Sequence, residues 1–243
     1  MPAERPTPRL RAVVRLAPDL ETELTSTLTH VDTWIFDLDQ TLYPHEAEVM
    51  ALVEGKMTAF VARETGMPYD EAYALQKKYL SEHGTTLAGL MAYHHIDPYT
   101  FLNEVHDVSL ENLHADPELN ALIKAMGGRK LVFTNGDNRH AVRILEKLEM
   151  TDLFDGVFHL EHANFIPKPN LVTFEKMMTA HAVKAETAAF FEDSPKNLRP
   201  AHDLGMKTIL VGPKAIGNTD GHVDFRSPSL LAFLRDSLPA LLA

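Results

Sequence analysis

The stretch FDLDQTLY, residues 36–43, decides the predicted fold. An apolar strand, expected over Thr33 to Asp39, leads directly into two acids separated by one residue. Two carboxylates placed so close together repel each other, and a hard divalent cation such as Mg²⁺ would relieve that repulsion because it prefers carboxylate and carbonyl oxygens. A strand end followed by a solvated acidic turn is the ordinary alternative, and the stretch by itself favours neither.

Strand-like segments recur along the chain with helical segments between them, which is the alternation of an α/β parallel sheet. Two of the helices have clear start signals. Asp137 precedes one over Asn138 to Leu148, and Ser194-Pro195 precedes one over Lys196 to Leu204. The expected strands are Thr33 to Asp39, Lys130 to Thr134, Gly156 to Leu160, Ala188 to Asp193 and Lys207 to Val211.

An interval of about 85 residues separates the first two expected strands, which is too long for a simple crossover. Asp97-Pro98 and Asp116-Pro117 each read as a helix N-cap followed by a first-turn proline. We therefore expect a helical bundle inserted into the sheet domain, and one amphipathic helix from Ser227 onward. Apolar residues follow helical spacing early in the interval, at Val49, Leu52, Val53, Met57, Phe60 and Val61.

The composition excludes several classes of protein. The chain has 243 residues with 45% hydrophobic content and no cysteine, so disulfides and thiolate chemistry are excluded. A net charge of -11 disfavours a broad nucleic-acid-binding surface, and no apolar run approaches the roughly 20 residues that cross a bilayer. The first eighteen residues are rich in arginine and weakly resemble a transit peptide. We interpret residues 1–30 as an N-terminal extension and the protein as cytoplasmic.

A second expected strand runs into Phe133-Thr134-Asn135-Gly136-Asp137. This segment leaves a hydroxyl and backbone amides just before a helix N-terminus, an arrangement that suits a phosphate oxygen. Simple helix capping by Asp137, with Gly136 making the turn, is the alternative, and the segment taken alone favours it.

Two further segments carry charge. Lys168 stands between two prolines that restrict its loop, so its ammonium would neutralise phosphate charge from a fixed place, although a lysine in such a loop is usually a surface residue. Glu192-Asp193 end another apolar strand, where they would complete a metal shell or simply cap a helix. Because the carboxyl ends of parallel strands line one crevice, we expect all these groups to come together.

The order of these four motifs resembles that of the haloacid dehalogenase superfamily: DxDxT, a hydroxyl after the second strand, a lysine, and an acidic pair. The resemblance extends from Val31 to Val211. It implies a Rossmann-like parallel-sheet core, expected over residues 31–43 and 125–243, with an inserted α-helical cap over residues 44–124.

The resemblance also implies a phosphatase mechanism. Asp37 would be the nucleophile that forms an aspartyl phosphate, and Asp39 would be the general acid and base. A Mg²⁺ ion would be held by Asp37, the backbone carbonyl of Asp39, Asp193 and, directly or through water, Glu192. The phosphoryl oxygens would be bound by Thr134, the Asn135 amide and Lys168. Supporting or substrate-contacting roles would fall to Ser194, Asn197, Tyr43 and His45.

A narrower resemblance points to the pyrimidine 5'-nucleotidases. It rests on Asp39 to Pro44, on Tyr79 with His83 to Leu90, and on Asp193 to Asn197. Gln40 and Glu192 depart from the usual Asn and Asp of that group. The implied partner is a small phosphate ester, a pyrimidine nucleoside 5'-monophosphate, and neither a nucleic-acid polymer nor a membrane.

The alternatives are a sugar-phosphate phosphatase or phosphomutase with the same core and, from another class, a catalytically silent binding or regulatory module. Dehalogenation is disfavoured because Asp39 supplies an acid suited to phosphate leaving groups. The oligomeric state is not predicted.

Overall fold

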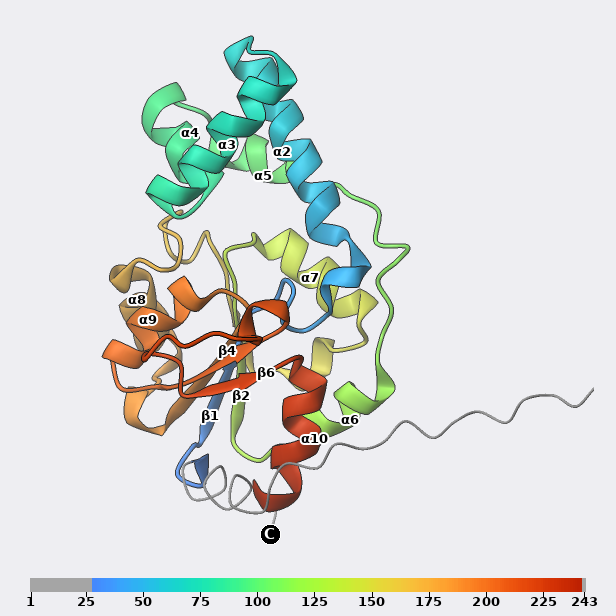
Figure 1. Cartoon of the computed structure of the whole chain (residues 1–243), viewed down its shortest axis with the longest axis vertical. Coiled ribbons are helices and arrows are strands. Elements are labelled where there is room, and N and C mark those ends of the chain that lie inside the picture. Colours follow the sequence, from blue (N-terminus) through green and yellow to red (C-terminus); the bar gives the residue numbers. More distant parts are fainter. Residues whose placement is uncertain (1–27, 242–243) are drawn as a thin grey trace, which may run out of the picture.

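A six-stranded parallel sheet forms the centre of the protein, in the strand order β3-β2-β1-β4-β5-β6 (Figure 1). The computed structural model describes residues 28–241, and the expected N-terminal extension therefore falls, up to Thr27, outside the described residues. The predicted α/β fold with a Rossmann-like sheet is confirmed. The strands are β1 (Thr33–Phe36), β2 (Arg129–Phe133), β3 (Gly156–Phe158), β4 (Ala188–Glu192), β5 (Lys207–Val211) and β6 (Phe225–Ser227).

Alternation along the strands divides the apolar core between the two faces of the sheet. Phe36, Val132 and Phe191 belong to one cluster, whereas the neighbouring Ile35, Phe133 and Phe190 belong to another. Both sets are fully buried, as expected for parallel strands covered on both faces. The helices that follow the strands are α7 (Asn138–Lys147), α8 (Leu171–His181) and α9 (Pro195–Asp203).

Three details of the strands and the last helix differ from the predictions. The strand β1 ends at Phe36 rather than Asp39, although the Asp37 N–H still donates to the Phe191 carbonyl at 2.9 Å. The edge strand β6 was not predicted, because three residues with an exposed Arg226 are too short to show an alternating pattern. The last helix begins at Leu230 rather than Ser227, and the Ser229 hydroxyl accepts a bond from the Ala232 N–H there.

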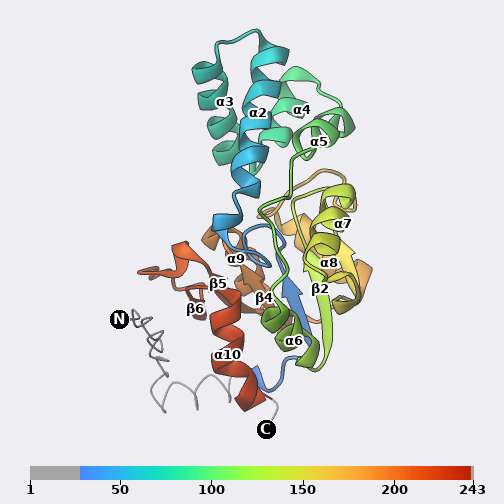
Figure 2. The ribbon, with the colours of Figure 1, turned by 90° about the vertical axis from the view of Figure 1, so that its right-hand side faces the viewer.

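Four helices between β1 and β2 pack into a bundle beyond the carboxyl end of β1, as Figures 1 and 2 show. The bundle has its own apolar cluster, which includes Phe60, Leu90 and Phe101. Leu160 and Phe165, from the loop after β3, pack into the same cluster and connect the bundle to the sheet domain. The four helices are α2 (Val49–Thr65), α3 (Tyr69–His83), α4 (Thr86–His94) and α5 (Pro98–Val105).

The next helix, α6 (Pro117–Ala125), packs against α10 (Leu230–Leu241) instead of the bundle. Its Leu119 and Ile123 side chains lie in the apolar cluster on the sheet. The predicted insertion over residues 44–124 includes most of α6, and we propose that the inserted unit ends before this helix. None of the helices in the described part of the chain is both long and apolar enough to span a bilayer.

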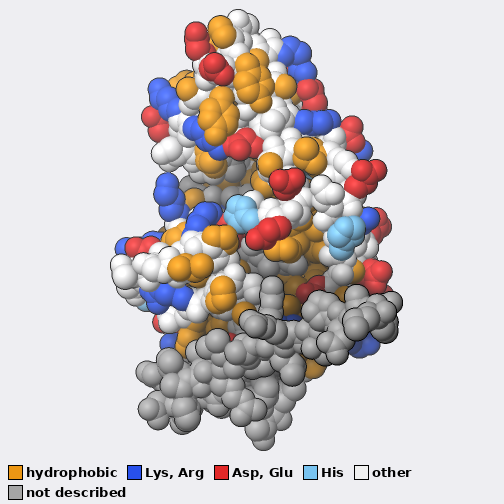
Figure 3. Space-filling view, turned by 45° about the vertical axis from the view of Figure 1, so that its right-hand side comes forward, with side chains coloured by type: hydrophobic (Ala, Val, Ile, Leu, Met, Phe, Trp, Pro, Cys, Tyr) orange, Lys and Arg blue, Asp and Glu red, His pale blue; other side chains and the backbone are white. Residues whose placement is uncertain are grey.

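The charged surface is mixed rather than segregated. On the face shown in Figure 3, acidic, basic and hydrophobic side chains alternate over the described residues, and no continuous field of Lys and Arg stands out there. This distribution agrees with the net charge of -11. It offers no extended basic stripe on that face for a nucleic-acid backbone to follow.

Candidate active site

Three neighbouring strands deliver polar groups to one edge of the sheet. β1 lies between β2 and β4, and its last residue, Phe36, pairs with Val132 on one side and Phe191 on the other. Asp37, Thr134 and Glu192 therefore end or follow adjacent strands at nearly the same level. The expected convergence of the motifs follows directly from this register.

Lys168 lies at the centre of the site. Its Nζ donates to Asp37 Oδ1, Glu192 Oε2 and the Phe133 carbonyl oxygen, each at 2.8 Å. The side chain is 1% exposed, so the surface alternative for this lysine is wrong. Three acceptors satisfy the three N–H donors of the ammonium, which is the condition under which a charge is tolerated inside a protein.

The buried charges around Lys168 shift one another's pKa. Burial raises the pKa of Asp37 to about 6, although the neighbouring Lys168 charge acts in the opposite direction. Burial and the Asp37 charge likewise raise the pKa of Glu192. Burial alone would lower the pKa of Lys168, but the two carboxylates outweigh it and raise that pKa. One lysine therefore serves two carboxyl groups, and the raised pKa values of Asp37 and Glu192 show that it does not fully compensate their burial and mutual repulsion.

The same acids form a group that fits a divalent cation. Among the described residues, oxygens of Asp37, Glu192 and Asp193 lie within 4.8 Å of one another. Hard carboxylate donors are those that Mg²⁺ prefers. One Asp193 oxygen also accepts a hydrogen bond from Lys214 Nζ at 2.7 Å, a partner that the sequence did not suggest. The expected ligand role of the Asp39 backbone carbonyl stays a prediction.

Asp39 has a different environment from Asp37. Its Oδ1 accepts hydrogen bonds from the Tyr43 hydroxyl at 2.5 Å and from His140 Nε2 at 2.8 Å. Burial would raise the pKa of Asp39, but the charge and hydrogen bond of His140, together with Tyr43, lower it to about 2. Tyr43 thus contacts Asp39, while the exposed His45 is bonded to the Gln40 side chain at 2.9 Å. The predicted substrate contacts of Tyr43 and His45 stay predictions.

The side chain of Asn135 fixes the loop that carries Lys168. Its Oδ1 accepts from the Lys168 backbone N–H at 2.8 Å, and its Nδ2 donates to the Lys168 carbonyl at 3.1 Å. The neighbouring Thr134 hydroxyl accepts from the Gly136 N–H at 2.9 Å. The Asn135 side chain is therefore used in holding the lysine loop, and only its backbone amide is left for the expected phosphate contact.

The remaining predicted residues lie at the start of α9. The Ser194 N–H donates to Glu192 Oε1 at 3.2 Å, so this residue supports the acid through its backbone, and its side chain makes no capping bond. Asn197 is half-buried in the first turn of that helix. The predicted supporting role of Asn197 stays a prediction.

Sequence reasoning missed a buried polar group next to Asp39. It consists of His140 on α7, Asp137 at the start of that helix, and His106 at the end of α5. The Asp137 cap was predicted, and its Oδ1 does accept from the His140 N–H at 2.7 Å. The position of His140 three residues after that cap is a local signal, but nothing local connects His106 to it.

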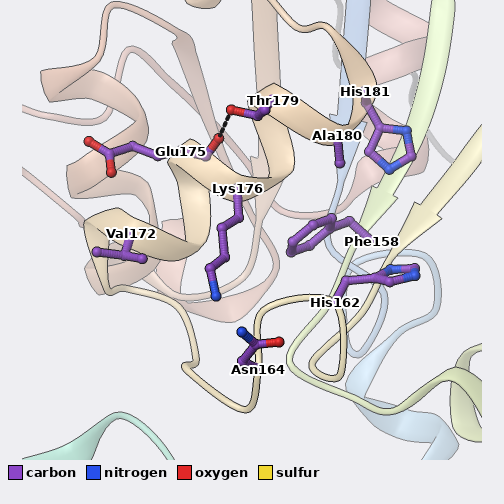
Figure 4. Close-up of a pocket in the computed structure, with 9 residues that line it drawn as sticks. All are labelled: Phe158, His162, Asn164, Val172, Glu175, Lys176, Thr179, Ala180 and His181. Carbon is purple, nitrogen blue, oxygen red and sulfur yellow. Dashed lines mark hydrogen bonds between the residues drawn. The ribbon is translucent and has the colours of Figure 1, made fainter.

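Two pockets of the structure differ in whether predicted site residues line them. One of about 670 Å³ lies between β3 and α8, where Phe158, His162, Lys176 and His181 line it (Figure 4), and none of the predicted site residues belongs to it. Another of about 260 Å³ is bordered by Gln40, Tyr43 and His45 of the loop after Asp39. The larger pocket is therefore not the site of the predicted chemistry, whereas the smaller one adjoins it.

Acids and a lysine gathered at the carboxyl edge of a Rossmann-like sheet define a class of α/β hydrolases. Residues 34–211 match the family of haloacid dehalogenase-like hydrolases. This chain belongs to that family, and the resemblance inferred from the four motifs is confirmed.

Individual proteins are similar to this chain over much of its length. Phosphate metabolism protein 8 of Saccharomyces cerevisiae is 30% identical over 193 residues, which are 73% of this chain and 60% of that protein. The chain thus spans less than two thirds of that relative's length.

Two solved structures share the fold. A HAD phosphatase from Thermococcus onnurineus has a TM-score of 0.57 and 19% identity, covering 84% of this chain and 96% of that one. A 2-haloacid dehalogenase from Pseudomonas syringae pv. Tomato DC3000 has a TM-score of 0.53 and 20% identity, covering 87% and 98%. At these identities the likeness concerns the fold and does not choose between the two activities.

Proposed function

We propose that this protein is a magnesium-dependent phosphomonoester hydrolase that works through an aspartyl phosphate on Asp37. One observation carries the proposal: two aspartates two residues apart have opposite electrostatic environments, one paired with a buried lysine and the other with a histidine and a tyrosine. Neighbouring acids whose pKa values are pushed apart are typical of sites that give the two groups separate roles. The order of the two acids in the DxDxT motif is what assigns the nucleophile to Asp37 and the acid and base to Asp39.

In the first step a carboxylate oxygen of Asp37 attacks phosphorus, and the bond from phosphorus to the leaving oxygen breaks. Lys168 orients this carboxylate, and the Thr41 hydroxyl lies 3.4 Å from its other oxygen. The positive charge of Lys168 also offsets the approach of an anionic substrate to an anionic nucleophile. The products of this step are the acyl phosphate and the free alcohol.

Asp39 transfers the protons in both steps. Its low pKa of about 2 means that it is ionised in the resting enzyme. The proton for the leaving alcohol therefore enters with the monoanionic form of the phosphate ester, which is roughly a tenth of the ester at pH 7 because its second pKa is about 6. Asp39 accepts this proton from the phosphate and passes it to the leaving oxygen. In the second step ionised Asp39 takes a proton from water, whose oxygen attacks phosphorus and breaks the bond to Asp37.

A magnesium ion would be held by Asp37, Asp193 and Glu192, whose oxygens form a fitting donor set. When bound, it supplies positive charge that screens the nucleophile from the phosphate. The chain's own contribution is the rigid placement of these acids at the ends of β1 and β4.

The proposed substrate is a pyrimidine nucleoside 5'-monophosphate, with the inserted helices acting as a cap that selects the leaving group. The turn after α3 supports this, because a Cβ at Gly84 would lie 3.3 Å from the Lys168 carbonyl oxygen. The segment named by the resemblance therefore touches the lysine loop. In the same segment the Tyr79 hydroxyl bonds His94 Nε2 at 2.8 Å, and the Tyr79 ring stacks on Tyr93 with centroids 5.7 Å apart.

A substrate panel tests both levels of the proposal. UMP, CMP, AMP, ribose 5-phosphate and 2-chloropropionate would be assayed with Mg²⁺ and with chelator. We expect UMP and CMP to have the highest kcat/KM, because a site built to bond the base leaves buried polar groups unpaired with the wrong partner. Equal kcat/KM for UMP, AMP and ribose 5-phosphate would reject the nucleotide preference alone. Halide release from 2-chloropropionate without phosphate release from any ester would reject the phosphatase.

A further inference from the structure

The two oxygens of Asp39 are used differently. Oδ1 accepts both hydrogen bonds, from the Tyr43 hydroxyl and from His140 Nε2. Oδ2 lies on the side of Gly136, since a Cβ built on that glycine would be 3.8 Å from Oδ2 and 3.3 Å from the Thr134 hydroxyl. One oxygen is therefore fixed to the protein, and the other faces the segment expected to bind phosphate.

Three features of its surroundings fix the position of His140, whose side chain is fully buried. The His140 backbone N–H donates to Asp137 at the helix start. The ring stacks on the His106 ring, with centroids 4.2 Å apart and planes inclined by 20°. Gly136 leaves room for the ring edge, because a Cβ there would lie 3.0 Å from His140 Cδ2. A ring held in this way presents Nε2 to Asp39 in one orientation.

His106 reaches this cluster from the inserted helices. It follows α5 directly, and its Nδ1 bonds the second oxygen of Asp137 at 2.6 Å. Arg143 of α7 donates to the backbone carbonyls of His106 at 2.6 Å and Val108 at 2.8 Å. Because carboxylate oxygens only accept, Nδ1 of His106 and Nε2 of His140 carry the protons of these bonds.

We propose that His140 is a positioning residue for Asp39, and that the His106–Asp137 pair holds its ring in place. This inference rests on the proposed function. The cluster holds Oδ1 of Asp39 so that Oδ2 meets the leaving oxygen and, later, the attacking water. It also joins the chain segment leaving the inserted helices to the acid that protonates the leaving group.

The leaving group distinguishes positioning from mere packing. An alkoxide such as the ribose 5'-oxygen needs a proton as it departs, whereas p-nitrophenolate leaves readily without one. A misplaced Asp39 therefore lowers kcat/KM, which reports on the first step, far more for UMP than for p-nitrophenyl phosphate, whereas it slows the second step equally for both esters. A loosened fold would slow both to the same extent.

The experiment compares His140→Phe with His140→Gln in the full chain. Phenylalanine keeps the stacked ring but has no donor, whereas the glutamine Nε2 can replace the donor that bonds Asp39. General acid–base catalysis contributes about 10²–10⁴-fold, and we expect His140→Phe to lose roughly 10- to 100-fold of kcat/KM for UMP, which is part of that factor. The kcat/KM for p-nitrophenyl phosphate should change by less than about 3-fold, while His140→Gln recovers most of the loss for UMP.

His106→Phe and His159→Phe complete the comparison. His106→Phe keeps the stacking on His140 but loses the Asp137 bond, so it should give a smaller loss with the same dependence on the leaving group. His159 is a matched control, because it also bonds a carboxylate, Glu161, at 2.6 Å and stacks on another ring, His162, at 3.7 Å, without touching Asp39. We expect its variant to treat both esters like the wild type.

The outcomes separate this role from the proposed function. An active wild type whose His140→Phe variant loses the same factor of kcat/KM on both esters would overturn the positioning role and leave the phosphatase intact. A wild type that hydrolyses neither ester would reject both. If His140→Phe does not fold, as judged by circular dichroism, His140→Gln and His106→Phe decide the question: an unchanged kcat/KM for UMP in His106→Phe would overturn the positioning role.

Discussion

Asp37 and Asp39 are separated by a single residue, yet their surroundings have opposite effects. Asp37 shares one lysine with Glu192, and burial raises its pKa to about 6. Asp39 is bonded to His140 and Tyr43, which outweigh burial and lower its pKa to about 2. The same residue type therefore receives two chemical roles from its neighbours, and those neighbours come from distant parts of the chain.

The largest expected effect comes from Asp37→Asn. An amide cannot form the acyl phosphate, so kcat for UMP should fall at least about 1,000-fold, which corresponds to about 4 kcal/mol in the barrier. Steady-state kinetics measure the loss, and circular dichroism should show an unchanged fold because the side chains are nearly isosteric. A variant that keeps a tenth of the wild-type kcat would show that Asp37 is not the nucleophile.

Asp39→Asn should have the next largest effect, and its size should depend on the leaving group. We expect kcat for UMP to fall by about 10²–10⁴-fold, because the amide neither carries nor accepts the transferred proton. The loss for p-nitrophenyl phosphate should be clearly smaller in parallel assays. Equal, small losses on the two esters would mean that Asp39 is structural.

Metal dependence tests the second role proposed for the surroundings of Asp37, which is to hold Mg²⁺. Activity should vanish in EDTA and return with Mg²⁺, and Asp193→Asn should raise the Mg²⁺ concentration for half-maximal activity by roughly 10-fold, since one charged oxygen ligand is lost. Lys214→Ala should lower that concentration by a few-fold, because it removes a cation bonded to Asp193. Magnesium titrations of the three proteins provide the test. Full activity in chelator would contradict the metal site.

The smallest expected effect is on the pH dependence of the free energy of unfolding, measured in chelator by urea unfolding. Asp37 has a folded pKa raised from 3.8 to about 6, so its contribution to stability is present below pH 3.8 and lost as pH rises through about 6. Asp39 has a folded pKa lowered to about 2, so its contribution is present above pH 3.8 and lost as pH falls through about 2.

The two asparagine variants should therefore differ from the wild type with opposite pH dependences of the free energy of unfolding. The free energy of unfolding of wild type relative to Asp37→Asn should fall between pH 4 and 6, while the same difference for Asp39→Asn should stay level there and fall only in stronger acid. Because burial and the Asp37 charge together raise the pKa of Glu192, the difference between pH 4 and 6 reports on these two acids together. Parallel curves for the two variants would show that the two acids share one environment.

Much of the fold and several site residues follow from the sequence alone. Short apolar runs separated by helical segments identify five of the six strands, and the acids or hydroxyl that end three of them place Asp37, Thr134 and Glu192 at one edge. These signals are local, because alternation and capping depend on residues a few positions apart. The parallel arrangement then brings strand ends together without further information.

Only the tertiary structure decides the environments that separate the two aspartates. Lys168 looks like a surface residue in its loop, yet it is buried against Asp37, 131 positions away in the chain. His106 and Asp137 are 31 positions apart and meet only because the chain leaving the inserted helices packs on α7. Such contacts depend on how helices and strands pack, which no local pattern encodes. The sequence thus determines which acids stand at the sheet edge, and packing determines their protonation, because burial and long-range charge pairs set a pKa.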